Sequence, residues 1–164
     1  MKYKQTLWMI CLILVSLLGC RKGPDTQFIE GVVKLDGVPL EKATVTFAPK
    51  STDYDPETLE RPLLASGVTD EKGYYRLSSV GGGQIGGGTT VGSYVVLIVK
   101  KEQTNTPPPA KPGEPSISVR PEYKYHTPKK FETRDTSGIE VDVVKGRNHF
   151  QFDLQSDGGF EIEK

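Results

Sequence analysis

The chain contains seven short runs rich in apolar side chains, and in most of them these side chains recur at every second position. In the first run, at 28–35, Ile29, Val33 and Leu35 share one face of an extended chain. Glu30 and Lys34 share the opposite face. A period of two is that of a half-buried β-strand, because successive side chains of a strand point to opposite faces. The seven predicted strands are 28–35, 43–49, 63–69, 74–78, 93–101, 138–144 and 149–154, of which 93–101 is apolar on both faces and is predicted to be central.

Turn-forming residues separate the predicted strands. Asp36 and Gly37 follow the first run, and Asp70 and Gly73 lie between the third and fourth. Asp70 can accept hydrogen bonds from its own backbone turn, and Gly73 can adopt a positive φ. With 18 Gly and 12 Pro in 164 residues, and no helical apolar stripe after residue 20, the composition also favours strands and turns. The sequence therefore predicts an all-β chain that forms one seven-stranded β-sandwich over residues 27–155.

Two long segments interrupt the strand pattern. A glycine-rich stretch at 80–93 contains GGGQIGGG, which lacks the Lys of a phosphate-binding loop and is interpreted as a loop between strands. The segment at 102–137 contains TPPPAKPGEP, so we expect a Pro-rich insertion at about 102–127. Residues 156–164 are expected to form a C-terminal tail outside the sandwich.

The N-terminal segment has the pattern of a secretory signal. Lys2 and Lys4 give a positive start, and an apolar run of 13 residues follows at 7–19. As a helix this run would span roughly 20 Å, which is short for a bilayer core of about 30 Å. We therefore favour a signal peptide over residues 1–19 rather than an uncleaved N-terminal helix.

The sequence LLGC at 17–20 resembles the bacterial lipobox, which ends in an obligatory Cys. The resemblance implies that the chain is cut before Cys20 and that the Cys20 thiol carries a diacylglyceryl group. A third acyl chain can then be added to the new N-terminus. Two or more acyl chains anchor a protein stably in a membrane. Residues 20–26 then form the lipidated Cys and a tether.

Two further residues refine this prediction. Arg21 occupies the position where an Asp in bacterial lipoproteins often signals retention in the inner membrane. The resemblance therefore favours the outer membrane in a cell that has one. The other cysteine, Cys11, lies inside the signal, so the mature chain is expected to have no free thiol and no disulfide.

Four segments together resemble the carboxypeptidase regulatory-like domain of bacterial lipoproteins. They are GVVKLDGVPLEKATVTFAP, ASGVTDEKGYYRL, GSYVVLIVKK and PKKFETRDTSGIEVDVVKGRNHFQFDL, within residues 27–154. This resemblance implies a transthyretin-like (prealbumin-like) seven-stranded Greek-key β-sandwich. It also implies a module without catalytic activity, because in carboxypeptidases this domain accompanies the catalytic domain. The shared motifs are structural ones, such as Asp36-Gly37 and Gly73, so they indicate a fold rather than a ligand.

The residues offer little for catalysis or metal binding. His126 and His149 occur as HTPK and HFQF, without the HExxH spacing of a zinc peptidase. The acidic stretch DYDPE at 53–57 lacks the remaining ligands of a calcium loop and is interpreted as a solvated loop. Lys34 and Asp142 fall on outward faces, which disfavours an isopeptide bond between them. We therefore predict no metal, no cofactor and no enzyme activity, with a cryptic hydrolase as a minor alternative.

The stretch PEYKYHTPKKF at 121–131 contains the candidate ligand-binding residues. Tyr123, Tyr125 and Phe131 alternate here with lysines. Exposed aromatic rings can stack on sugars or insert into a partner's groove. The alternative, which we favour, is that these rings fold back and cover an edge or face of the sandwich.

The net charge and the predicted cellular location complete the functional expectation. With Lys2 and Lys4 removed, 19 basic and 21 acidic side chains remain, so the mature chain has no basic field for nucleic acid. We expect an envelope protein, anchored to the membrane through Cys20, whose sandwich is an interaction or scaffold module for an unknown envelope partner. The alternative is a glycan-binding module that uses Tyr123 and Tyr125.

Overall fold

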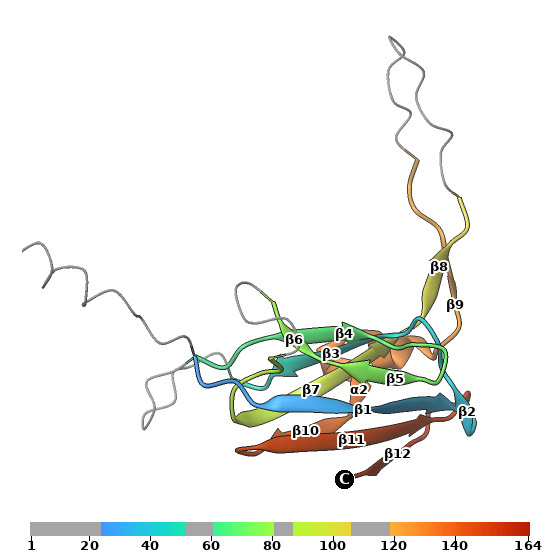
Figure 1. Ribbon diagram of the computed structural model, residues 1–164. Helices are drawn as coiled ribbons and strands as arrows, with labels where there is room; N and C mark the ends of the chain where they lie inside the picture. The colour runs from blue at the N-terminus through green and yellow to red at the C-terminus, as the bar shows by residue number, and fades with distance from the viewer. Residues whose placement is uncertain (1–23, 52–60, 81–86, 106–118) are drawn as a thin grey trace, which may run out of the picture.

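The computed structural model describes residues 24–51, 61–80, 87–105 and 119–164, which form two facing β-sheets and a projecting two-stranded ribbon (Figure 1). The first sheet contains β1 (Phe28–Leu35), β2 (Val38–Pro39), β5 (Tyr74–Arg76), β11 (Arg147–Leu154) and β12 (Phe160–Glu163). The second contains β3 (Thr44–Pro49), β4 (Ala65–Val68), β6 (Ser78–Ser79), β7 (Gly92–Val99) and β10 (Glu140–Val143). The ribbon consists of β8 (Lys101–Gln103) and β9 (Tyr123–Tyr125), and two short helical turns follow it, η1 (Lys129–Glu132) and α2 (Arg134–Ser137).

The two sheets differ in topology. The first has the order β12-β11-β1-β2, with β5 also paired to β1, and its central pair β1 and β11 is parallel. The second has the order β10-β7-β3-β4-β6 and is antiparallel throughout. Within the described residues β7 is therefore an interior strand, as its apolar sequence predicted.

The all-β prediction is confirmed. Each of the seven predicted runs overlaps one of the observed strands, and β1 has the predicted bounds. The described residues contain five further short strands that the alternation did not indicate: β2, β6, β8, β9 and β12. Four of these are only two or three residues long, too short for a period of two to be recognised.

The C-terminal segment is not the separate tail that the sequence suggested. Phe160–Glu163 forms β12 and pairs antiparallel with β11, which adds an edge strand to the first sheet. The turn before it is also fixed, because the Ser156 amide donates to Asp36 Oδ1 at 2.9 Å. The Ser156 hydroxyl donates to the same carboxylate and is the main cause of the lowered pKa of Asp36.

Aromatic rings join the two sheets at the centre of the core. Phe47 in the second sheet lies 5.8 Å from the ring of Phe150 and 6.3 Å from that of Phe152, both in the first sheet. Tyr94 of β7 lies 6.2 Å from Phe47, and all four side chains are buried. Large buried aromatic side chains contribute about 1.5–3 kcal/mol each through burial, which makes this cluster a main source of stability.

A close approach of two backbones explains a glycine in β1. Gly31 pairs with Phe150 of β11, and a Cβ at position 31 would lie only 1.8 Å from the Phe150 carbonyl oxygen. The hydroxyl of buried Tyr75 donates to the same oxygen at 3.0 Å. Burial raises the pKa of Tyr75, so it remains a neutral donor.

The predicted turn between the third and fourth runs has the expected chemistry. The Asp70 carboxylate accepts from the amides of Lys72 and Tyr74, each at 2.9 Å, and Gly73 has a φ of 73°. Beside it, buried Thr69 donates to Leu40 O at 2.5 Å and accepts from Ala43 N at 2.8 Å. These bonds fix the turn against the neighbouring loop.

Replacing Gly31 with Ala tests the close approach of β1 and β11. We expect Gly31→Ala to lower the free energy of unfolding by about 3 kcal/mol, because the added methyl group must push two paired strands apart. Gly37→Ala is the matched control. Its φ of 77° strains an alanine, but no atom lies within 4 Å of the added Cβ, so a loss of about 1 kcal/mol is expected. Chemical denaturation followed by circular dichroism measures both, and equal losses would contradict this explanation.

Candidate functional site

A groove of about 360 Å³ lies on the outer face of the second sheet. Its lining comes from β3 and the turn just before it, from β7, from the start of the ribbon and from the end of η1. We call it the outer groove: Lys42, Thr44, Thr46, Leu97, Val99, Lys101 and Glu132. The strand residues alternate with core residues such as Val45 and Ile98, which explains why they point outward. The groove combines ammonium groups, hydroxyl groups and aliphatic side chains.

An ion pair closes one side of the outer groove. Lys101 Nζ lies 2.5 Å from Glu132 Oε1, and the Tyr125 hydroxyl donates to the same oxygen at 3.3 Å. The hydrogen bond from Lys101 is the main cause of the lowered pKa of Glu132, and the same bond raises the pKa of Lys101. Both groups therefore stay charged across the neutral range. Lys42, which also lines the groove, forms an ion pair with its neighbour Glu41 at 2.9 Å.

The two candidate tyrosines lie beside this ion pair, with lysines over their rings. Lys101 Nζ is 4.8 Å from the ring centre of Tyr123 and 5.7 Å from that of Tyr125. Lys129 Nζ is 4.7 Å from the ring centre of Tyr125. Tyr123 is 43% exposed, whereas Tyr125 is half-buried. A sugar that stacks on a ring face occupied by one of these lysines would have to displace its ammonium group.

Phe131 is not available to a ligand, contrary to its place among the candidate residues. Its side chain is fully buried and meets the ring of Phe160 edge to face, 6.1 Å between centres. Lys130 lies over both rings, at 5.1 Å and 5.8 Å. The preferred interpretation of the stretch at 121–131 is therefore correct for Phe131, which attaches η1 to the C-terminal strand.

The other sequence candidates are dispersed in the structure. His126 Nε2 lies 3.3 Å from Glu102 Oε2 in the ribbon, and His149 is exposed on the outer face of the first sheet. Lys34 and Asp142 belong to different sheets. In the described ranges, no group of three or more His, Cys, Asp or Glu side chains could hold a metal ion. Cys20, the acidic stretch at 53–57 and residues 81–86 of the glycine-rich stretch lie outside the described residues.

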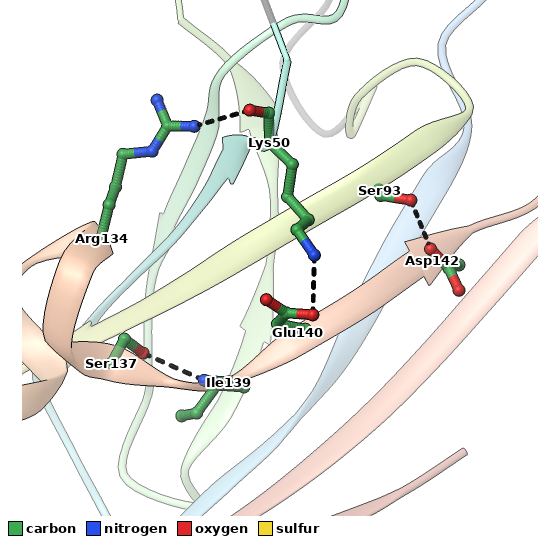
Figure 2. A network of polar contacts seen from close by, with 7 residues as sticks. All are labelled: Lys50, Ser93, Arg134, Ser137, Ile139, Glu140 and Asp142. Carbon is green, nitrogen blue, oxygen red and sulfur yellow. Dashed lines mark hydrogen bonds and ion pairs between the residues drawn. The ribbon is translucent and has the colours of Figure 1, made fainter.

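A polar network at the edge of the second sheet was not predicted (Figure 2). Lys50 Nζ donates to Glu140 Oε2 at 2.7 Å, and the Ser93 hydroxyl donates to Asp142 Oδ1 at 2.6 Å. Arg134 of α2 donates to the carbonyl of Lys50 at 3.3 Å and to that of Pro49. These contacts attach the short helical turn and β10 to β3 and β7. The polar groups of Lys50, Glu140, Ser93, Asp142 and Arg134 are thus engaged in hydrogen bonds that hold the fold together.

Comparisons with known proteins do not extend the resemblance noted in the sequence. No protein-family model, no curated protein and no solved structure matched this chain. In the part of the chain that the structure describes, none of the helices is long and apolar enough to cross a membrane.

The ion pair of the outer groove predicts a specific acid sensitivity. The folded pKa of Glu132 lies below its ordinary value of 4.5, so the stabilisation is complete above about pH 4.5. It is lost as the pH falls through the lowered value. Glu132→Gln is therefore expected to lower the free energy of unfolding by up to about 1 kcal/mol near neutral pH, and by progressively less in acid.

Thermal unfolding of the unchanged chain and of Glu132→Gln, from neutral pH downward, measures this difference. Glu161→Gln in β12, on the other sheet, is the matched control for loss of one negative charge. A constant difference between the unchanged chain and Glu132→Gln at every pH would show that the ion pair contributes nothing.

Proposed function

We propose that this protein is a lipid-anchored component of a bacterial cell envelope whose β-sandwich acts as a non-catalytic interaction module. The anchor is the diacylglyceryl group on Cys20, the signal peptide is residues 1–19, and residues 20–26 are the tether. The outer membrane is the favoured location because Arg21 follows the Cys. The partner is an envelope protein that binds the outer groove.

The proposed anchor is supported by the sequence and by the position of the first strand. LLGC has the order of residues that lipoprotein processing requires, and the run before it is of signal-peptide length. β1 begins at Phe28, eight residues after Cys20. A short tether of this kind keeps a folded domain close to the membrane surface while leaving its side chains accessible.

The observation that carries the proposed interaction role is the composition of the outer groove. Leu97 and Val99 supply apolar area, Lys101 and Lys42 supply cations, and Thr44 supplies a hydroxyl. A surface that combines apolar residues with polar groups is typical of protein–protein contacts. The projecting ribbon beside the groove enlarges the accessible area (Figure 1).

We also propose a more specific fold, a transthyretin-like Greek-key sandwich of the carboxypeptidase regulatory-like type. Two facing sheets with a common core agree with that architecture. A companion module of this type performs no chemistry itself, which agrees with an interaction role.

Removing the thiol of Cys20 tests the anchor. In a bacterium that processes lipoproteins, we expect Cys20→Ala to abolish labelling by radioactive palmitate and to leave the signal peptide uncleaved by the lipoprotein route. Cys11→Ala is the matched control. That cysteine lies in the signal, so its substitution is expected to leave labelling unchanged. Palmitate autoradiography and membrane fractionation give the result, and unlabelled wild-type protein would refute the anchor.

A second candidate function is glycan binding, which the exposure of Tyr123 favours. A tyrosine ring at the edge of a groove can stack on a sugar ring. In this case the sugar would compete with Lys101 for the ring face. The two functions therefore differ in which residues contact the ligand.

One experiment separates the two candidates. A photo-crosslinking amino acid at Thr44, in the outer groove, is expected to give a discrete crosslinked protein in intact cells. The same amino acid at Val38, exposed in the other sheet, is the control and should not give that product. If the protein is instead a glycan-binding module, we expect no crosslink at Thr44. We then expect binding to an envelope-glycan array, which the double substitution Tyr123→Ala with Tyr125→Ala reduces by about tenfold or more.

A further inference from the structure

Four exposed aliphatic side chains lie at the end of the sandwich where the N-terminal segment joins β1. We call them the entry-end residues: Leu64, Val80, Val91 and Val144, which are 40%, 57%, 48% and 59% exposed. They come from segments far apart in the sequence. Single exposed aliphatic residues are ordinary, but several at one end of a domain indicate a surface that contacts something apolar.

Hydrogen bonds around Gln27 bring these segments together. The Gln27 amide donates to Thr89 O at 2.6 Å, two residues before Val91. Gln27 Oε1 accepts from the Gly146 amide at 2.7 Å, two residues after Val144. Next to β4 and β6 of the second sheet, the Val80 amide donates to Leu64 O at 2.8 Å. The entry of the chain into β1, the start of β7 and the turn between β10 and β11 lie together at the left of Figure 1.

Two guanidinium groups lie on the first sheet at the same end. Those of Arg76 and Arg147 are 4.7 Å and 5.0 Å from the ring centre of Phe28, the first residue of β1. Both approach Glu30, at 3.8 Å and 4.0 Å, but the two arginine side chains remain 52% and 76% exposed. Exposed guanidinium groups bind phosphate oxygens well. Lys145, in the turn after Val144, is also exposed.

The length of the tether limits which end of the domain lies near the membrane. Gln27 lies seven residue steps after Cys20, so a fully extended tether spans about 25 Å at most. The eight residues of β1 extend about another 26 Å toward the opposite end of the sandwich. The entry end is therefore the part of the described domain that the anchor holds closest to the lipid.

We propose that the entry end docks on the surface of the bilayer that carries the Cys20 anchor. The four aliphatic side chains enter the interfacial region, and the guanidinium groups of Arg76 and Arg147 bind phosphate groups of anionic lipids. This combination of apolar contacts and cations is the one that peripheral proteins use on membranes. The proposal rests on the proposed lipid anchor, and it implies that the outer groove and the ribbon face away from the bilayer.

Fluorescence quenching by lipid-borne quenchers tests this orientation. Full-length Val144→Cys and Val68→Cys are produced in a bacterium that processes lipoproteins and are reconstituted into phosphatidylethanolamine–phosphatidylglycerol vesicles. Val68 lies at the opposite end of the sandwich and is 62% exposed, which matches Val144 at 59%. With an environment-sensitive fluorophore on the new cysteine, we expect quenching at position 144 to exceed that at 68 by about twofold or more.

The unsubstituted chain separates failure of docking from failure of the anchor. If it incorporates the thiol-reactive fluorophore, Cys20 is not lipidated, and the anchor and the docking proposal both fail. If it does not, and positions 144 and 68 are quenched equally or neither is quenched, docking fails while the anchor stands. Vesicles without phosphatidylglycerol should show a smaller difference between the two positions. An unchanged difference would refute the role given to Arg76 and Arg147.

Discussion

The parallel pairing of β1 with β11 is the constraint on which the remaining architecture depends. It joins the first strand after the N-terminal segment to a strand more than a hundred residues later, and it places the starts of both strands at the same end of the sandwich. The pairing is close enough at Gly31 that only a residue without a Cβ fits against Phe150. β5 and β2 pair along the other side of β1, and β12 pairs along the other side of β11.

The second sheet depends on this pairing through the core. Phe150 and Phe152 of β11 face Phe47 of β3, so the position of β11 determines where the opposite sheet packs. The outward face of that sheet then carries the alternate residues, including those of the outer groove. A polar network at its edge, which includes Lys50 and Glu140, holds β10 in line (Figure 2). Because one set of alternate side chains in the second sheet is needed in the core, the other set faces outward and forms the candidate binding surface.

Sequence periodicity was sufficient where a strand is long enough to repeat its pattern and buries one face. It identified β1, β3 and β11 closely, and the carboxylate of Asp70 was enough to predict its turn. It was insufficient for the C-terminal strand, where Phe160 and Ile162 alternate over only four residues. Phe131 was selected as a possible ligand contact because its local neighbours are lysines. Its burial depends on Phe160, which is 29 residues away and gives no local signal.

The sequence by itself determined that the described chain is all-β with defined turns, and it predicts a lipoprotein signal before the first strand. These properties are local, because alternation, turn chemistry and the LLGC motif each involve only a few consecutive residues. Only the tertiary structure decided that Lys101, Tyr125 and Glu132 form one cluster, and that four aliphatic side chains share the end where the chain enters. Such groupings depend on long-range strand pairing, whose register is set by burial across the whole sandwich rather than by neighbouring residues.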